Sequence, residues 1–175
     1  IAPLPYLPPM KKVLDIGSGG GFPGIPLKVI HPEIELTLVD AVRKKASFMQ
    51  HVIRKLSLNS AKAVHSRVEN LHDQGGAFGP YDTIVCRAFS DLSFIIPYAL
   101  PLLTLDGEIV VWKGRTPERE INQFKARFPD QALSLRIQID SYRLPILNAE
   151  RNLVRITTCK DVIEQLHYTE DPGFI

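Results

Sequence analysis

The chain has 175 residues, of which 45% are hydrophobic, so it has the size of one ordinary domain with a substantial core. It contains no run of about 18 apolar residues and no signal-peptide pattern, which argues against a membrane span or secretion. The formal net charge of +2 neither requires nor excludes a polyanionic partner. Cys86, Cys159 and the scattered histidines show no metal-ligand spacing. We expect a cytoplasmic protein with no metal and no membrane partner.

Apolar runs and helical patterns alternate along the first 128 residues. Strands are predicted at residues 12–16, 35–39, 61–65, 82–87 and 108–113, and helices at 23–30, 43–56, 92–103 and 117–128. The first helix should end at His31, because the residue before Pro32 is pushed out of the α region. Asp106 and Gly107 are expected to turn the chain into the fifth strand. This alternation predicts a mostly parallel sheet with helices on both faces.

The pattern changes after the fourth predicted helix. Residues 133–144 and 152–159 both alternate between apolar and polar, and the connection between them is too short for a crossover helix. These two segments should pair antiparallel. The expectation is an α/β, Rossmann-like domain over residues 1–160, with a mostly parallel seven-stranded sheet and a terminal antiparallel pair, followed by a tail over 161–175. A dinucleotide-binding fold would instead carry six parallel strands.

Within the second predicted helix, apolar residues recur at helical spacing and indicate a core-facing stripe. Its members are Ala46, Phe48, Met49, Val52, Ile53 and Leu56. Basic residues, among them Arg43, Lys44 and Lys45, are left on the outer side. Such a charged run is typical of a solvated helix surface, and it also fits a nucleic-acid partner.

The first strand leads into a glycine-rich turn that is typical of a nucleotide-type cofactor site. Gly17, Gly19 and Gly21 can adopt positive φ and leave the backbone bare for a ligand, and Asp40 follows at the spacing of a carboxylate that accepts ribose hydroxyls. The same glycines match a dinucleotide motif, so NAD stays an alternative. Asp15 favours S-adenosylmethionine, because a nearby carboxylate suits a cationic ligand better than a diphosphate. Asp40 as a helix N-cap is the other interpretation of that residue.

In an open α/β sheet, ligands bind beyond the carboxyl ends of the strands. The candidate positions are therefore the residues that end each predicted strand, namely 17–21, Asp40, 66–69, 87–89 and Lys113 with Arg115. A guanidinium at the end of an apolar strand needs a partner, which favours an active-site role for Arg87. Arg87 and Lys113 are the expected catalytic residues, and Phe89 also follows the end of the fourth predicted strand.

Several of these motifs together resemble one family. Residues 15–26 (DIGSGGGFPGIP), 38–45 (LVDAVRKK), 66–69 (SRVE), 87–89 (RAF), 113–114 (KG) and 150–154 (ERNLV) are similar to the glucose-inhibited division protein B family, which has the class I S-adenosylmethionine-dependent methyltransferase fold. The resemblance implies a bacterial enzyme that methylates guanine N7 in 16S ribosomal RNA. Its members carry a longer, partly helical N-terminal segment, so this chain looks truncated. Asn152 stands where histidine is common.

The resemblance implies specific cofactor contacts and partners. Its S-adenosylmethionine contacts would fall on Gly17, Phe22, Val68, Glu69 and Arg87, and Asp40 matches its acidic position. The expected partner is 16S ribosomal RNA or the small ribosomal subunit rather than DNA, and the chain is expected to be a monomer. A small-molecule methyltransferase, an NAD-linked oxidoreductase and a non-catalytic cofactor-binding protein are the alternatives.

Overall fold

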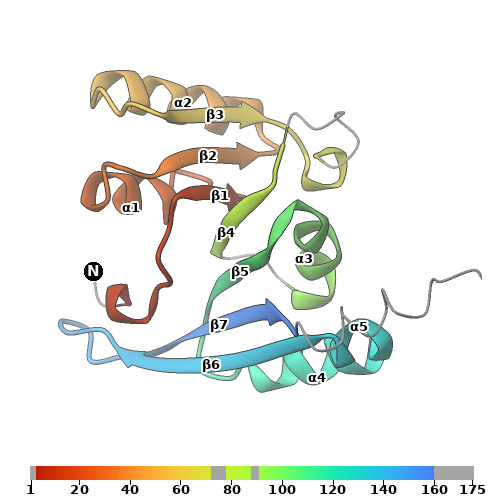
Figure 1. Cartoon of the computed structure of the whole chain (residues 1–175). Helices are drawn as coiled ribbons and strands as arrows, with labels where there is room; N and C mark the ends of the chain where they lie inside the picture. The colour runs from red at the N-terminus through yellow and green to blue at the C-terminus, as the bar shows by residue number, and fades with distance from the viewer. Residues whose placement is uncertain (1–2, 72–77, 88–90, 160–175) are drawn as a thin grey trace, which may run out of the picture.

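The fold is a seven-stranded sheet in the order β3-β2-β1-β4-β5-β7-β6. It was obtained as a computed structural model that describes residues 3–71, 78–87 and 91–159. The five strands from β3 to β5 are mutually parallel, whereas β7 runs antiparallel to both β5 and β6. Figure 1 shows the strand order from top to bottom. The strands are β1 Lys12–Ile16, β2 Glu35–Asp40, β3 Ala61–His65, β4 Tyr81–Arg87, β5 Leu103–Lys113, β6 Leu135–Arg143 and β7 Glu150–Thr158.

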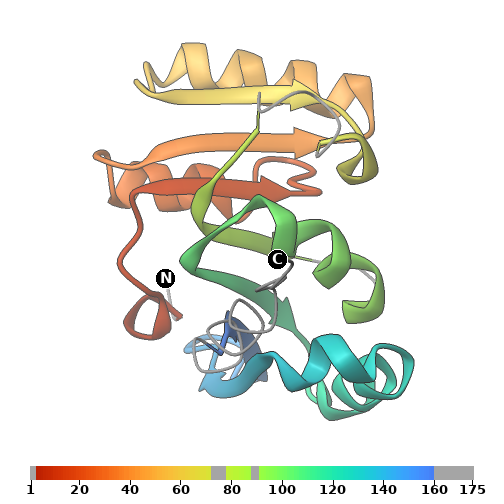
Figure 2. The ribbon, with the colours of Figure 1, turned by 45° about the vertical axis from the view of Figure 1, so that its right-hand side comes forward.

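Two layers of helices enclose the sheet (Figures 1 and 2). Helices α1 (Gly24–Ile30) and α2 (Arg43–Lys55) pack on one face, while α3 (Leu92–Ala99) and α4 (Glu118–Arg127) pack on the other. A short helix, α5 (Pro129–Leu133), contacts β6. Three single-turn 3-10 helices complete the described elements, η1 Leu4–Tyr6, η2 Val68–Asn70 and η3 Leu100–Leu102. The predicted α/β fold with an antiparallel pair at one end is confirmed.

The central strands read as apolar runs because both of their faces are buried. Along β4, Ile84 and Cys86 pack against the α3 and α4 layer, while Val85 between them packs against the α1 and α2 layer. The same alternation divides β5, where Ile109 and Val111 face one way and Val110 the other. Strands enclosed in this way lose the alternating polar pattern that marks a strand with one wet face. Because these strands are packed on both faces, they hold the loops at their carboxyl ends in fixed positions.

The boundaries of the third helix and the fifth strand differ from the prediction. The helix ends at Ala99 and is continued by η3, while β5 begins at Leu103 rather than at Glu108. Asp106 and Gly107 lie inside β5, at an irregularity where the pairing with β4 shifts from Tyr81↔Leu103 to Thr83↔Glu108. A bulge of this kind accommodates turn-forming residues within a strand.

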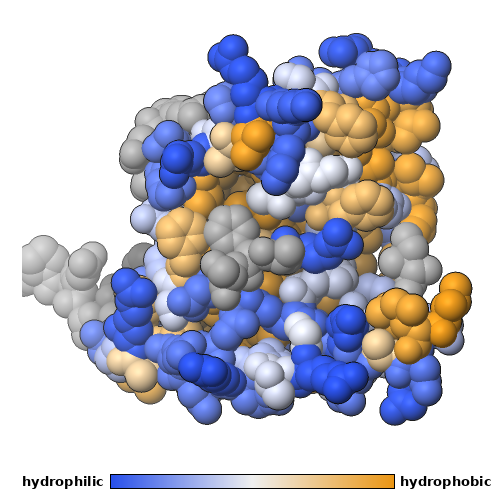
Figure 3. Space-filling view, turned by 180° about the vertical axis from the view of Figure 1, so that it is seen from behind, coloured by the Kyte–Doolittle hydropathy of each residue, from blue (hydrophilic) through white to orange (hydrophobic). Residues whose placement is uncertain are grey.

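The predicted core stripe of α2 is confirmed only in part. Ala46, Met49 and Ile53 are buried, but Phe48 is 52% exposed and Leu56 is 51% exposed. Phe48 instead lines a shallow hollow between α1 and α2. Apolar side chains gather on this side of the molecule, at the upper right of Figure 3.

Two further findings concern the described part of the chain. None of its helices has the length and apolar character needed to cross a membrane. Cys86 is buried within β4, as predicted, whereas Cys159 lies just beyond the end of β7 and is only half-buried.

Candidate functional site

A cavity of about 600 Å³ opens at the carboxyl ends of the parallel strands. Residues that end β1, β2 and β4 line it, together with the β3–η2 connection and the start of α2. The sheet order reverses here, because β1 leads through α1 to β2 on one side while β4 lies on the other. Such a reversal is where open α/β sheets bind ligands. The position predicted from the strand ends is therefore the position of the cavity.

The glycine-rich turn presents bare backbone to this cavity. Gly17 has a φ of +68° and Gly19 a φ of +61°, which are backbone conformations that residues with a Cβ rarely adopt. Gly17 N and Ser18 N both donate to Val39 O, at 2.9 and 3.1 Å, which ties the turn to the end of β2. A ligand can thus approach the main chain closely at a turn whose conformation is held from the neighbouring strand.

Gly21 and Gly24 act on the far side of the turn, where they allow α1 to pack closely. A Cβ on Gly21, whose φ is +90°, would lie 2.3 Å from Ile25 Cδ1, and one on Gly24 would lie 2.5 Å from Leu38 Cδ2. The cavity lining includes Gly17 and Gly19 but not Gly21. A direct cofactor contact from Gly21 stays a prediction, and the geometry here gives this glycine a packing role.

The carboxylate of Asp40 bridges two segments at the cavity wall. Its Oδ2 accepts a hydrogen bond from Gly19 N at 2.9 Å, and its Oδ1 accepts one from Val42 N at 2.8 Å. The residue is 6% exposed and lines the cavity. A carboxylate offers about four lone-pair sites, so two remain for ribose hydroxyls. The alternative interpretation as a helix N-cap is wrong, because Val42 occupies the N-cap of α2.

Asp15 lies beneath the turn. It is fully buried, its Oδ2 accepts from Gly24 N at 2.7 Å, and its Oδ1 has no hydrogen-bond partner among the described residues. Burial raises the pKa of this carboxyl to about 7, against the opposing effects of the Gly24 hydrogen bond, the nearby Ser18 hydroxyl and the Arg87 charge. Asp15 does not line the cavity. Its carboxyl therefore fixes the turn to α1 rather than contacting a ligand directly.

Arg87 and Phe22 both line the cavity and contact each other. The guanidinium Cζ of Arg87 lies 5.3 Å from the centroid of the Phe22 ring, which is 49% exposed. This is the range of a cation–π contact. Val68 and Glu69, from η2, also line the cavity. The structure thus brings together at one cavity the predicted residues Gly17, Gly19, Phe22, Asp40, Val68, Glu69 and Arg87.

Lys113 lies apart from this group. Its Nζ donates to Glu120 Oε2 at 2.5 Å, its side chain is 7% exposed, and it does not line the cavity. Beside it, Asn152 donates from Nδ2 to Gly114 O and accepts at Oδ1 from Ser141 Oγ. The catalytic role expected for Lys113 stays a prediction that these contacts do not favour. Phe89 lies outside the described residues.

Ser18 and Arg67 line the cavity and fall within the predicted strand-end ranges 17–21 and 66–69, whereas the lining residues Lys45 and Phe94 lie outside every predicted range. Ser18 follows a predicted glycine, and its hydroxyl donates to Asp15 O at 2.8 Å. Lys45 belongs to the basic run at the start of α2, so the proximity of that run to Asp40 in the sequence was the available signal. Phe94 comes from α3, and nothing in the local sequence indicates that this helix reaches the cavity.

The cavity suits a nucleoside ligand. Its volume lies in the range of small-molecule sites, and bare backbone at Gly17 and Gly19 stands beside the free lone pairs of Asp40. No group of His, Cys, Asp and Glu among the described residues could hold a metal ion.

Solved structures share this fold. An rRNA methylase from Streptococcus thermophilus aligns with a TM-score of 0.61 at 14% identity, over 85% of this chain and 87% of that one. Fibrillarin from Aeropyrum pernix, solved in complex with natively bound S-adenosyl-L-methionine, aligns with a TM-score of 0.62 at 12% identity, over 84% of this chain and 66% of that one. The fold is that of the class I S-adenosylmethionine-dependent methyltransferases. The dinucleotide alternative is not favoured, because β7 is antiparallel.

Sequence comparison defines the family. A family model described as rRNA small subunit methyltransferase G matches residues 1–138, and the chain belongs to that family. The ribosomal RNA small subunit methyltransferase G of Geobacter sp. (strain M21) is 39% identical over 83% of this chain, and that of Geotalea uraniireducens is 43% identical over 82%. The matched stretches span 65% and 64% of those relatives. This family is the same as the glucose-inhibited division protein B family that the motifs resemble, so the predicted family is confirmed.

Proposed function

We propose that this chain binds S-adenosylmethionine and transfers its methyl group to guanine N7 in 16S ribosomal RNA. The observation that carries the proposal is the coincidence of two results. The chain belongs to the rRNA small subunit methyltransferase G family, and all six residues matched to that family's cofactor positions line one cavity at the switch point of the sheet. Family membership supports methyl transfer as the reaction, and the cavity is a site at which the cofactor can bind.

Different residues of the cavity are expected to contact different parts of the cofactor. Gly17 and Gly19 leave room for the ligand against the backbone, and Asp40 offers its remaining lone pairs to the two ribose hydroxyls. Glu69 also lines the cavity, and its carboxylate can accept hydrogen bonds from the ligand. Because Asp40 also holds Gly19 and Val42 in place, the ribose contact and the shape of the turn depend on the same carboxylate.

The chemistry places few demands on the protein. S-adenosylmethionine, when bound, supplies an electrophilic methyl group. Guanine N7 carries an in-plane lone pair and no hydrogen, so the site needs no general base. The task of the chain is alignment, and holding two reactants in line can lower a barrier by roughly 7 kcal/mol or more. Arg87 stands at the mouth with its charge against Phe22, where it can hold the guanine O6 or an adjacent phosphate.

The decisive experiment is methyl transfer to a defined RNA. The protein is incubated with tritiated-methyl S-adenosylmethionine and small-subunit particles from a strain that lacks the enzyme, and the labelled base is mapped. Label on guanine N7 supports the proposal. Cofactor binding with no label in any RNA would instead show a non-catalytic binding protein, and tight NADH binding without S-adenosylmethionine binding would overturn the cofactor assignment.

Arg87→Ala tests the substrate contact within this assay. Loss of a charge-assisted hydrogen bond should lower kcat/KM for RNA by about 10- to 100-fold. Arg119→Ala is the matched control, since Arg119 is an exposed arginine on α4 outside the cavity lining. Equal rates for the two variants would remove Arg87 from the proposed site.

A further inference from the structure

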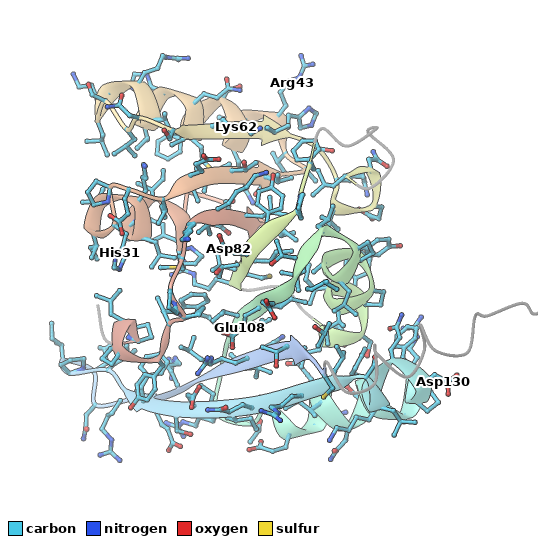
Figure 4. The ribbon with its side chains drawn as sticks, viewed as in Figure 1. His31, Arg43, Lys62, Asp82, Glu108 and Asp130 are labelled. Carbon is cyan, nitrogen blue, oxygen red and sulfur yellow. The ribbon has the colours of Figure 1, made fainter. Side chains whose placement is uncertain are left out.

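The start of α2 carries a concentration of positive charge beside the cavity. Arg43, Lys44 and Lys45 are consecutive and exposed, and Lys45 lines the cavity itself. Figure 4 shows Arg43 above the carboxyl ends of β2 and β3, extending away from the sheet. Two further exposed arginines, Arg67 and Arg87, line the cavity from other segments. We call these five residues the basic rim.

The position of these charges is unfavourable for the helix. The N-terminus of a helix is its positive end, where acidic residues stabilise and basic residues destabilise. The first turn of α2 contains no acidic residue, and its N-cap Val42 makes no side-chain capping bond. Three adjacent cations at this end also repel one another. Residues that break a local rule of this kind without a structural gain are expected at functional sites.

Among the described residues, Arg87 is the rim member whose charge has a direct contact, with the Phe22 ring, and that contact leaves its hydrogen-bond donors open to a partner. None of the ion pairs found among residues 3–71, 78–87 and 91–159 includes a member of the basic rim. The carboxylates that share the cavity are otherwise engaged or set back, since Asp40 is buried against Gly19 and Val42 and Glu69 is half-buried on the wall. The outer edge of the mouth is therefore dominated by exposed positive charge.

We infer that the basic rim is the docking surface for the RNA phosphates that flank the target guanine. The inference rests on the proposed function, because a nucleobase that enters the cavity brings the phosphates on both of its sides to the mouth. Rim residues come from three segments that meet at the cavity, namely α2, the β3–η2 connection and the end of β4. A polyanion can contact several of them at once, and this contact is independent of sequence.

The test uses two double variants of the same helix. Arg43→Gln with Lys44→Gln removes two rim charges that do not line the cavity. Arg54→Gln with Lys55→Gln removes two exposed charges at the other end of α2, about 17 Å away along the helix. The two proteins have the same net charge. Loss of the rim pair relieves the helix N-terminus, so this variant is expected to be at least as stable as the wild type.

Affinity for a fluorescent single-stranded oligoribonucleotide is measured between about 50 and 200 mM salt. The rim variant should bind about 10-fold more weakly at low salt, and the slope of log affinity against log salt should fall by about 1 to 2. The control variant should stay within about 2-fold of the wild type. Binding of S-adenosylhomocysteine, measured by calorimetry, should be equal in all three proteins.

The outcomes separate this inference from the proposed function. If the wild type methylates small-subunit RNA but the rim and control variants bind RNA alike, the docking surface is wrong and the proposed function stands. If both variants lose affinity equally, the effect is one of net charge, and the assignment to the rim is overturned. If the rim variant alone loses RNA affinity while the wild type transfers no methyl group, the rim binds RNA and the proposed reaction falls.

Discussion

The carboxylate of Asp40, at the end of β2, accepts a hydrogen bond from the backbone amide of Gly19 at 2.9 Å. This bond links the two sequence features that predicted a cofactor site, the glycine-rich turn and the acidic residue about 20 positions later. The second carboxylate oxygen accepts from Val42 N, just before α2. One side chain therefore positions both the turn and the start of the helix that carries three members of the basic rim.

Asp40→Asn should weaken cofactor binding more than its loss of charge implies. An Asn side chain has only one acceptor oxygen, so either Gly19 N or Val42 N loses its partner. Leaving a buried donor unsatisfied costs about 1–3 kcal/mol. Affinity for S-adenosylhomocysteine, measured by calorimetry, should fall about 10- to 100-fold. Unchanged affinity would show that the turn keeps its shape without this carboxylate.

Gly24→Ala should destabilise the protein by about 1–3 kcal/mol. A Cβ at this position would lie 2.5 Å from Leu38 Cδ2 and 2.7 Å from Asp15 Oδ2, so α1 must move away from the sheet. Gly114→Ala is the matched control, because a Cβ there meets nothing within 4 Å. Denaturant unfolding of both variants measures the difference. A loss of equal size in the two would mean that helix packing at Gly24 is not the cause.

Most of the fold could be predicted because each signal was local. Buried parallel strands appear as short apolar runs, and the short connection between residues 144 and 152 forced the last two strands to pair antiparallel. The start of β5 could not be predicted in the same way. Asp106 and Gly107 form a turn in most contexts, but here β5 begins before them, where Leu103 pairs with Tyr81.

The candidate site likewise contains residues that the sequence could place and residues that it could not. Strand-end residues such as Arg87 and Val68 could be placed, because the carboxyl ends of parallel strands meet at one edge of the sheet. Phe94 was missed because its position depends on the packing of α3 against η2. Lys113 also ends its strand, yet Glu120 from α4 holds its ammonium in an ion pair. The partner of a buried charge is set by tertiary packing, which sequence spacing does not show.

Asp15 should make stability depend on pH. Burial raises its pKa to about 7 in the folded protein, from an ordinary value of 3.8. Ionisation is therefore harder in the folded state than in the unfolded one. The stability that this carboxyl contributes is fully present below about pH 4 and is lost as pH rises through about 7.

Asp15→Asn should remove that loss, because an amide keeps an acceptor for Gly24 N and does not ionise. Relative to the wild type, the free energy of unfolding of the variant should rise between about pH 4 and 7 by an amount on the order of 4 kcal/mol, and then level off. Chemical denaturation across this range measures the difference. Asp130→Asn, at an exposed carboxylate on α5, is the control that should follow the wild-type profile. A constant offset for Asp15→Asn at every pH would contradict the prediction.

Arg155 and Glu108 form an ion pair between β7 and β5. Because Glu108 is buried, we expect the stability of the fold to depend on its guanidinium partner. Arg155 Nε donates to Glu108 Oε1 at 2.5 Å and Nη2 to Oε2 at 3.0 Å, while the Glu108 side chain is only 7% exposed. Arg155→Met leaves that carboxylate without its guanidinium and should cost about 3–5 kcal/mol of stability. Replacing both residues by Met removes the buried charge along with its partner, so the double variant should regain most of the lost stability.

Arg151→Met, on the same strand, is the control. Among the described contacts its guanidinium donates only to the Glu150 carbonyl, so this variant should change the unfolding midpoint little. A double variant no more stable than Arg155→Met would show that the pair stabilises the sheet by itself, beyond compensating for a buried charge.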